Sequence, residues 1–372
     1  MTRKVLFCAT VADHFKSFHL PFMRWFQEQG WEVHIAAHGD IELPYVNKKY
    51  NIPIQRSPLN IKNIKAFNEL KSVIDNNNYK IIHCHTPVGG MLARLAALRA
   101  RKYGAKVIYT AHGFHFCKEA PLVNWLLYYP IEKWWARYTD CLITINQEDY
   151  ARAVIDGFKA GSIERVHGMG VDVDKYKPTT EPEKNNLRKK HRYKVEQFIL
   201  FYAAELNKNK NQSLLIKSVS NLKRSIPNIK LLLAGKGALE EEYRKLALKE
   251  KVQNEVDFLG YRSDIDELLK LSDVAVASSL REGLPISIAE AMACGLPLVV
   301  SHNRGHNELV ADGVNGYVIP DNNYLLFSEK LLTIYKDLEL RMKMGNESLK
   351  QVATYNLIQV GSEMSQIYRH YM

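Results

Sequence analysis

Short apolar runs rich in β-branched residues alternate with longer amphipathic stretches along the first half of the chain. The short runs predict strands at Val5–Thr10, Glu32–Ala37, Ile52–Gln55, Lys80–His83, Lys106–Thr110 and Cys141–Ile145. The longer stretches predict helices at Ser17–Gln29, Ile64–Asn76, Met91–Tyr103, Asn124–Tyr138 and Gln147–Ile155. Continuous apolar strands separated by helices are typical of a parallel sheet that is covered on both faces.

The second half repeats this alternation after a connection that we interpret as a linker. It runs from Gly168–Asp172 through Tyr176–Pro178 into the polar stretch Thr179–Arg192. The predicted strands of the second half are Phe198–Ala204, Lys230–Ala234, Val256–Leu259, Val274–Ala277 and Leu298–Ser301, and its helices include Gln212–Ile226, Leu239–Leu248 and Ile286–Met292. The pattern predicts an α/β protein of two doubly wound, Rossmann-like domains. Ligands of such folds bind at the carboxyl ends of the strands, so we expect them in a central cleft that both domains face.

The last residues, 356–372, follow a second domain whose pattern is already complete. Apolar side chains recur there at spacings of three and four, namely Leu357, Val360, Met364, Ile367, Tyr368 and Tyr371. This spacing predicts a helix, and we expect the helix to cross back to the N-terminal domain.

Composition excludes several classes of protein. With 372 residues, 46% hydrophobic and 24% charged, the chain resembles an ordinary two-domain globular protein and not a disordered or fibrous one. The five cysteines are far apart and form no C-x-x-C pair, which disfavours structural zinc and a disulfide framework. No apolar run reaches the ~18 residues of a membrane span, and Asp13 closes the N-terminal apolar stretch early. We therefore expect a cytoplasmic protein.

The net charge of +11 is concentrated in the first half, where residues 1–180 carry 24 lysines and arginines against 16 acidic residues. A basic half indicates a polyanionic partner, such as nucleic acid, an anionic membrane surface or a phosphorylated substrate. Nucleic acid is disfavoured because the chain has no zinc-finger spacing and no RNP motif. A solvated basic surface without a partner remains an alternative.

The most informative segment is residues 281–297, with the sequence REGLPISIAEAMACGLP. A predicted strand runs into a glycine-containing loop, and a helix begins near Pro285. The free amides at the start of a helix favour a phosphate. Glu282 precedes this helix and Glu290 lies about one and a half turns inside it. Two carboxylates are also compatible with acid/base catalysis, whereas a metal site is disfavoured because no histidine or aspartate lies nearby at ligand spacing.

This segment resembles the E-x7-E motif of the retaining glycosyltransferases of family 4, which have the GT-B fold. Other segments match the same family in the same order: Ala234–Gly237, Phe258–Tyr261, Asn307–Val310 and Asp312–Tyr317. Two further segments, His85–Gly90 and Ala111–Phe116, are similar to its bacterial exopolysaccharide and capsule branch. The resemblance covers nearly the whole chain. It implies an acceptor-binding domain at 1–170 and a nucleotide-sugar-binding domain at 171–355.

The resemblance also implies roles for individual residues of the second domain. Glu290 would accept hydrogen bonds from the ribose hydroxyls, and Glu282 would contact the donor sugar. The remaining donor-binding residues would be Gly283, Leu284, Pro285, Ile286, Ser287, Lys208, Gly235, Tyr261 and Arg262. Lys210 matches a family lysine that faces the pyrophosphate. Glu205 stands where the family usually has an arginine, so it either turns away or binds a lysine.

In the first domain the resemblance implies that His112, which follows a predicted strand, lies beside the donor sugar and the reacting centre. With Glu282 and Lys210 it completes the predicted catalytic set. The loop after the first strand lacks the glycine that is usual in the family, so Asp13 and His14 are expected to face the acceptor, together with His115. His83 and His85 are equally compatible with hydrogen-bonded core histidines.

Residues 121–138 combine aromatic side chains, among them Trp125, Tyr128, Tyr129, Trp134 and Trp135, with basic ones, as membrane-surface helices do. A core helix that packs its aromatic residues is the alternative interpretation. A second basic group, Arg94, Arg99, Arg101 and Lys102, is a candidate surface for anionic lipid.

Together these features indicate a retaining glycosyltransferase, peripheral to the inner face of the cell membrane, that needs no metal or other cofactor. The expected donor is a UDP-sugar, and the expected acceptor is a polyprenyl-diphosphate-linked saccharide in capsule or exopolysaccharide assembly. A UDP-sugar 2-epimerase of the same fold and a non-catalytic nucleotide-sugar-binding subunit are the alternatives. A dinucleotide dehydrogenase is disfavoured because no G-x-G-x-x-G follows the first strand.

Overall fold

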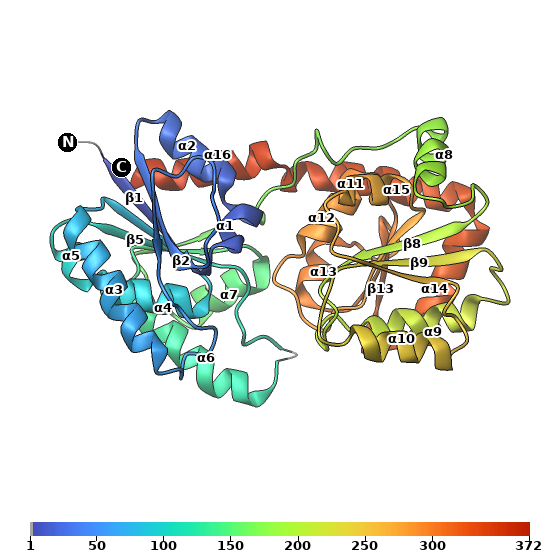
Figure 1. Cartoon of the computed structure of the whole chain (residues 1–372), viewed down its shortest axis with the longest axis horizontal. Helices are drawn as coiled ribbons and strands as arrows, with labels where there is room; N and C mark the ends of the chain where they lie inside the picture. Colours follow the sequence, from blue (N-terminus) through green and yellow to red (C-terminus); the bar gives the residue numbers. More distant parts are fainter. Residues whose placement is uncertain (1–2, 119) are drawn as a thin grey trace. The chain divides into compact units, whose positions relative to one another are not determined.

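A computed structural model describes residues 3–118 and 120–372 of the chain (Figure 1). The chain divides into two compact units. Unit 1 comprises the residues up to Met169 together with Ile358–Met372, and unit 2 comprises Gly170–Leu357. Each unit contains one parallel sheet with helices packed against it, so the predicted class, two Rossmann-like α/β domains, is confirmed.

The sheet of unit 1 has seven strands in the order β3-β2-β1-β4-β5-β6-β7, and all neighbouring pairs are parallel. The strands are β1 (Lys4–Val11), β2 (Glu32–His38), β3 (Lys48–Asn51), β4 (Ile81–His85), β5 (Lys106–Ala111), β6 (Cys141–Thr144) and β7 (Ser162–Arg165). The central strand β1 is buried from Val5 to Thr10, which explains why its sequence is a continuous apolar run.

Helices connect these strands and enclose an apolar core. They are α1 (Asp13–Phe18), α2 (Leu20–Glu28), α3 (Lys62–Asn77), α4 (Pro87–Ala96), α5 (Leu98–Lys102), α6 (Leu122–Trp135), the 3-10 turn η1 (Ala136–Tyr138) and α7 (Gln147–Ile155). Two glycines of α4 allow close packing. A Cβ atom on Gly89 would lie 2.8 Å from the backbone nitrogen of Thr10, and one on Gly90 would lie 2.5 Å from the Tyr109 ring.

The sheet of unit 2 has six parallel strands in the order β10-β9-β8-β11-β12-β13. The strands are β8 (Phe198–Ala203), β9 (Ile229–Ala234), β10 (Val256–Gly260), β11 (Val274–Ala277), β12 (Leu298–Ser301) and β13 (Gly316–Ile319). The helices are α8 (Glu181–Lys190), α9 (Gln212–Leu222), α10 (Glu240–Lys249), α11 (Ile265–Lys270), α12 (Ile286–Ala293), α13 (Arg304–Leu309), α14 (Tyr324–Lys336) and α15 (Leu338–Val352), with 3-10 turns η2 (Pro320–Asn322) and η3 (Ala353–Tyr355).

The C-terminal helix α16 (Leu357–His370) belongs to unit 1, although the rest of that unit ends at Met169. Its Tyr368 is fully buried, stacks on Trp25 at 5.6 Å between ring centroids, and contacts His83 Nδ1 through its hydroxyl at 2.9 Å. His167 contacts Glu363 at 2.7 Å. The final helix therefore completes the core of the N-terminal unit.

Three sequence-based interpretations are corrected here. The polar stretch Thr179–Arg192 is not a linker, because it contains α8, whose buried Arg188 pairs with Asp273 at 2.7 Å. The strand predicted at Ile52–Gln55 lies four residues earlier, as β3. Arg94 is not part of a basic surface, since only 1% of it is exposed and it pairs with Glu132 of α6 at 2.9 Å.

Candidate active site

In each sheet the strand order reverses once, between β1 and β4 in unit 1 and between β8 and β11 in unit 2. Loops that follow the two strands at such a point diverge and leave a place for ligands at the carboxyl edge. The predicted site residues fall into two sets, one at each reversal. Lys210 and Glu282 belong to unit 2, whereas His14 and His112 belong to unit 1.

Lys210 and Glu282 meet at the reversal in unit 2. Lys210 lies in the loop after β8 and Glu282 in the loop after β11, and Nζ lies 2.5 Å from Oε1. Hydrogen bonds from side chains to backbone carbonyls tie the two loops together, since the Ser278 hydroxyl donates to the Lys210 carbonyl at 2.7 Å and Asn209 Nδ2 donates to the Arg281 carbonyl at 3.0 Å. The lysine is therefore held in place before any ligand binds.

The other two charged residues of the β8 loop, Glu205 and Lys208, are both exposed. Among the described residues no ion pair joins Glu205 to a lysine, so of the two alternatives considered for it, binding a lysine is not observed.

The N-terminus of α12 lies directly after Glu282. Its N-cap residue is Pro285, which has no side-chain oxygen and leaves the first amides of the helix available. Gly305 of α13 packs closely here, because a Cβ atom would lie 2.9 Å from both Glu282 Cβ and the Gly283 carbonyl. Arg304 Nε donates to the Glu282 carbonyl at 3.0 Å. The run Gly283, Leu284, Pro285, Ile286 and Ser287 is thus a supported backbone segment of the kind that binds phosphate.

Glu290 lies within α12 and forms a hydrogen bond with the side chain of Tyr176. Burial raises the pKa of this carboxyl to about 7, although the Tyr176 hydrogen bond and nearby Lys175 favour the charged form. Sequence reasoning missed Tyr176. The sequence analysis placed it only in the linker between the two domains.

Three further donor-side candidates follow β9 and β10. Gly235 adopts a φ of +147°, and a Cβ atom there would lie 2.0 Å from the Ala204 carbonyl oxygen, so only glycine fits. Tyr261 is 77% exposed. Arg262 forms a two-bond ion pair with Asp264, with Nε 2.8 Å from Oδ1. In unit 2, Arg262 is thus engaged by a carboxylate and Tyr261 is free to stack on a ligand.

In unit 1, four histidines converge at the carboxyl edge of the sheet. His14 and His19 come from α1 and the junction of α1 with α2, whereas His85 ends β4 and His112 follows β5. His14 Nε2 lies 3.2 Å from His112 Nε2 and 3.2 Å from His19 Nε2. His112 Nε2 lies 3.3 Å from His85 Nδ1. The sequence analysis singled out three of these residues and missed His19.

Burial keeps these imidazoles neutral. It lowers the pKa of His14 to about 4, and it lowers the pKa values of His19, His85 and His112 well below the usual range. His83, next to the cluster, is a hydrogen-bonded core residue with Thr110 at 2.8 Å and Tyr368 at 2.9 Å. Of the two residues considered as hydrogen-bonded core histidines, His83 is one, whereas His85 belongs to the cluster.

The remaining acceptor-side candidates lie outside the cluster. Asp13 and His115 are exposed, and His115 contacts the Tyr128 ring on α6 at 4.6 Å between ring centroids. Most aromatic side chains of α6 pack on the core, as the core-helix alternative predicts. The exposed part of α6 is mainly aliphatic, since Leu122 and Leu126 are each 80% exposed, and Trp134 is 52% exposed. Within residues 3–118 and 120–372, no helix is both long and apolar enough to cross a membrane.

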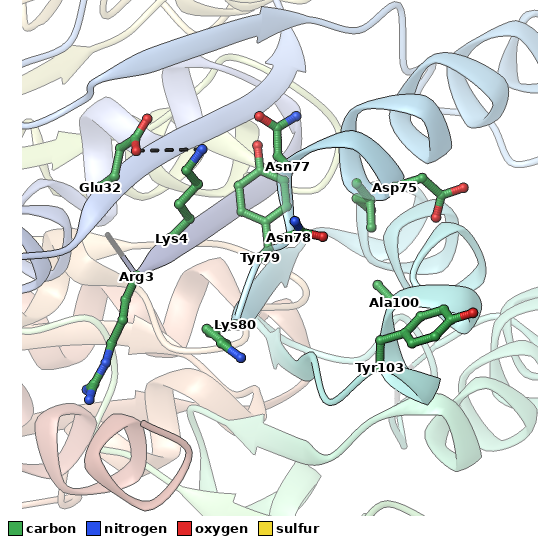
Figure 2. Close-up of a pocket in the computed structure, with 11 residues that line it drawn as sticks. Arg3, Lys4, Glu32, Asp75, Asn77, Asn78, Tyr79, Lys80, Ala100 and Tyr103 are labelled. Carbon is green, nitrogen blue, oxygen red and sulfur yellow. Dashed lines mark ion pairs between the residues drawn. The ribbon is translucent and has the colours of Figure 1, made fainter. Parts of the chain in front are cut away.

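A separate pocket of about 580 Å³ lies at the opposite edge of the unit 1 sheet (Figure 2). Figure 2 shows Lys4, at the start of β1, paired with Glu32, at the start of β2, across 3.7 Å. Lys80, which precedes β4, lines the same pocket. Because these residues are at the amino ends of their strands, this pocket is not the ligand site that the fold predicts.

Comparison with known proteins identifies the class. Residues 4–146 match the family "Glycosyl transferase 4-like", and residues 183–351 match "Glycosyl transferases group 1". The glycosyltransferase EpsD of Bacillus subtilis (strain 168) is 50% identical over all of this chain and 98% of its own length. The chain therefore belongs to the family 4 glycosyltransferases of GT-B fold, in the bacterial exopolysaccharide branch, and is an enzyme that transfers sugars.

Two other proteins carry more detail in their names. An Escherichia coli relative, 29% identical over 83% of this chain and 80% of its own length, is a UDP-Gal:α-D-GlcNAc-diphosphoundecaprenol α-1,3-galactosyltransferase. Anabaena HepE, solved in complex with UDP and glucose, matches 99% of this chain and 100% of its own, with a TM-score of 0.82 and 18% identity. At that identity the likeness to HepE shows the fold alone.

Proposed function

We propose that this glycosyltransferase moves a sugar from a UDP-sugar to a polyprenyl-diphosphate-linked saccharide, with retention at the anomeric carbon, during exopolysaccharide assembly. The observation that carries the proposal is the Lys210–Glu282 pair beside the open N-terminus of α12. This arrangement offers positive charge for a pyrophosphate next to a carboxylate for sugar hydroxyls.

The donor half of the proposal follows from the chemistry of unit 2. Glu290 is an acceptor suited to the two hydroxyls of a ribose, and the amides at Ile286 and Ser287 are placed as phosphate donors. The choice of uridine is supported by the E. coli relative, whose name gives UDP-galactose as donor.

The proposed reaction has no protein nucleophile. As the bond between the anomeric carbon and the pyrophosphate breaks, negative charge grows on the leaving phosphate. Lys210 and the first amides of α12 stabilise that charge because they are positioned in advance. The departing phosphate takes the proton of the acceptor hydroxyl on the same face, so that the configuration is retained. Because Lys210 and the helix amides supply the positive charge that the leaving phosphate needs, we expect the transfer step itself to need no metal.

The acceptor half rests on relatives and on the surface of unit 1. The names of the E. coli relative and of a Campylobacter jejuni relative specify diphosphoundecaprenol-linked acceptors. An acceptor of this kind lies in a membrane, and the exposed leucines of α6 together with Arg99 and Lys102 offer an apolar and basic surface for it. We expect the protein at the cytoplasmic face of the membrane.

The test is a transfer assay with radiolabelled UDP-sugars and a synthetic polyprenyl-diphosphate N-acetylhexosamine. We expect label to move from the aqueous to the lipid fraction with one UDP-sugar, and NMR of the product to show an α linkage. Conversion of the UDP-sugar into its C2 epimer without an acceptor would identify an epimerase. Binding of UDP-sugar with neither reaction would identify a non-catalytic subunit.

A further inference from the structure

We infer that the histidine cluster of unit 1 is a metal site that binds one zinc ion through His14, His19, His85 and His112. The inference does not rest on the proposed donor or acceptor. The sequence disfavoured a metal at the E-x7-E segment, which lies in unit 2, and its cysteine spacing gave no sign of zinc. The four ligands come from three separate places in the chain, which leaves no recognisable spacing motif.

The distances between the ring nitrogens match a tetrahedral zinc site. Zinc binds imidazole nitrogen at about 2.0–2.1 Å, so two nitrogens on one tetrahedral ion lie about 3.3–3.4 Å apart. The three contacts in the cluster are 3.2, 3.2 and 3.3 Å. One nitrogen from each of the four rings lies within 4.8 Å of all the others. A small ion at the centre thus requires only minor movement of the side chains.

Hydrogen bonding alone accounts poorly for this arrangement. An imidazole nitrogen has a single in-plane site, which either carries a proton or accepts one. His14 Nε2 has two nitrogen neighbours, and so has His112 Nε2, so neither can make linear bonds to both. In addition, the fully buried atoms His19 Nδ1 and His85 Nε2 have no hydrogen-bond partner among the described residues. Such unsatisfied atoms are costly, and a ligand that organises the rings gives a reason for them.

The chemistry of the ligands selects the class of metal. Four neutral imidazoles suit zinc, copper, nickel or iron, whereas magnesium and calcium require oxygen ligands. Zinc is the choice here because the three measured nitrogen–nitrogen distances are close to those expected for a tetrahedral zinc ion.

The position of the cluster defines what the ion would do. Four protein ligands close a tetrahedral site and leave no coordination position for a substrate. The ion would tie the α1–α2 junction to the carboxyl ends of β4 and β5, at the strand reversal of the sheet. We therefore assign it a structural role in unit 1. It would also hold the His112 ring through Nε2 and leave Nδ1 facing outward from the ion.

The experiment uses the full chain purified without a histidine tag, stripped with a chelator and dialysed against zinc. All five tryptophans, Trp25, Trp31, Trp125, Trp134 and Trp135, lie in unit 1, so the melting curve followed by tryptophan fluorescence reports this unit. We expect one zinc per chain by elemental analysis and a melting temperature several degrees above that of the stripped protein. His19→Gln and His85→Gln should lose both effects.

The matched control is His34→Gln. His34 is also buried in unit 1, but both its ring nitrogens have partners, Tyr79 and Glu32, each at 2.7 Å. This variant should keep one zinc per chain. X-ray absorption of the zinc-loaded wild type should show four nitrogen ligands and provides a test if the variants fail to fold. Wild-type protein that retains no zinc, equal zinc content in His19→Gln and wild type, or a zinc spectrum dominated by oxygen ligands would each overturn the inference.

Discussion

Lys210 and Glu282 are 72 positions apart in the sequence, yet Nζ and Oε1 lie 2.5 Å apart at the strand reversal of unit 2. The lysine is thus partly neutralised until a pyrophosphate competes with the carboxylate for it. We expect Lys210→Ala to lower turnover by about 10²–10³, since removing one positioned donor to a developing anion costs that much. Steady-state kinetics would measure this. Lys208→Ala, an exposed lysine of the same loop, is the control and should lower turnover much less.

The same ion pair also predicts that replacing Glu282 strengthens nucleotide binding. Glu282→Gln removes the competing charge, so UDP itself should bind about two- to fivefold more tightly. Transfer should nevertheless fall, because the carboxylate that contacts the donor sugar is lost. Isothermal titration with UDP would show the gain. Weaker UDP binding in a folded Glu282→Gln protein would contradict the arrangement proposed here.

Glu290 gives a pH-dependent prediction. Its pKa of about 7 lies above the ordinary value for glutamate, so the folded protein holds this proton between roughly pH 4.5 and 7 and its stability falls as pH rises through that window. Ribose hydroxyls need the charged form as acceptor. Binding of a UDP-sugar, whose own charge is constant here, should therefore strengthen about tenfold from about pH 6 to about pH 8. Glu290→Gln should bind weakly at both values.

A substitution at Tyr176 tests the Glu290 carboxyl group in a second way. Its hydrogen bond favours the charged form of Glu290. Tyr176→Phe should consequently move the midpoint of the binding profile to higher pH, whereas a purely structural role would weaken binding equally at all pH values. Glu290→Ala should weaken UDP binding by about 10–150-fold, the equivalent of one or two charged hydrogen bonds.

A buried ion pair joins α4 to α6 in unit 1. Arg94 is 1% exposed, pairs with Glu132 at 2.9 Å, and lies 4.0 Å from the centre of the Tyr109 ring. Glu132→Ala would leave this arginine buried without its partner, which costs about 3–5 kcal/mol. Tryptophan fluorescence during urea unfolding would measure the loss. Glu28→Ala, which removes an exposed ion pair with Arg24 at 2.8 Å, should cost less than about 1 kcal/mol.

The exposed leucines of α6 predict how unit 1 meets a membrane. Leu122→Ser combined with Leu126→Ser should reduce binding to anionic vesicles in a flotation assay, because apolar area is lost. Arg99→Glu should reduce binding mainly at low salt. Leu59→Ser is the control, since Leu59 is 79% exposed in unit 1 but lies outside α6. Equal binding of all these proteins to neutral and anionic vesicles would exclude this surface.

The sequence predicted the fold well because continuous apolar strands are a strong signal. The prediction of individual elements failed where a segment that forms a helix or a strand is polar. The stretch around Thr180 is so polar that it was interpreted as a linker, although Thr180 and Glu183 form a capping box that marks the start of α8. Strand β3 was displaced because its residues, Lys48–Asn51, are polar and partly exposed at the sheet edge.

Some residues of the candidate site were predicted from the sequence and others were not, because a sequence shows only local patterns. Glu282, Glu290 and Lys210 lie in segments whose pattern matches a known family. His19 and Tyr176 lie outside such segments, and their importance depends on tertiary contacts. His19 was placed inside a single predicted helix, Ser17–Gln29, whereas the chain breaks there into α1 and α2 and turns the ring toward His14. No local pattern reports a contact of this kind.

The return of α16 to unit 1 has a consequence for how the protein is made. Domains of a growing chain generally fold in order of synthesis, the N-terminal one first. Here Tyr368 of α16, which follows unit 2 in the sequence, fills the space beside Phe26 and His83 in unit 1. Unit 2 is continuous in sequence and can close on the ribosome, while unit 1 must wait with part of its apolar surface uncovered until α16 has been synthesised. The first domain to emerge is therefore the last to be finished.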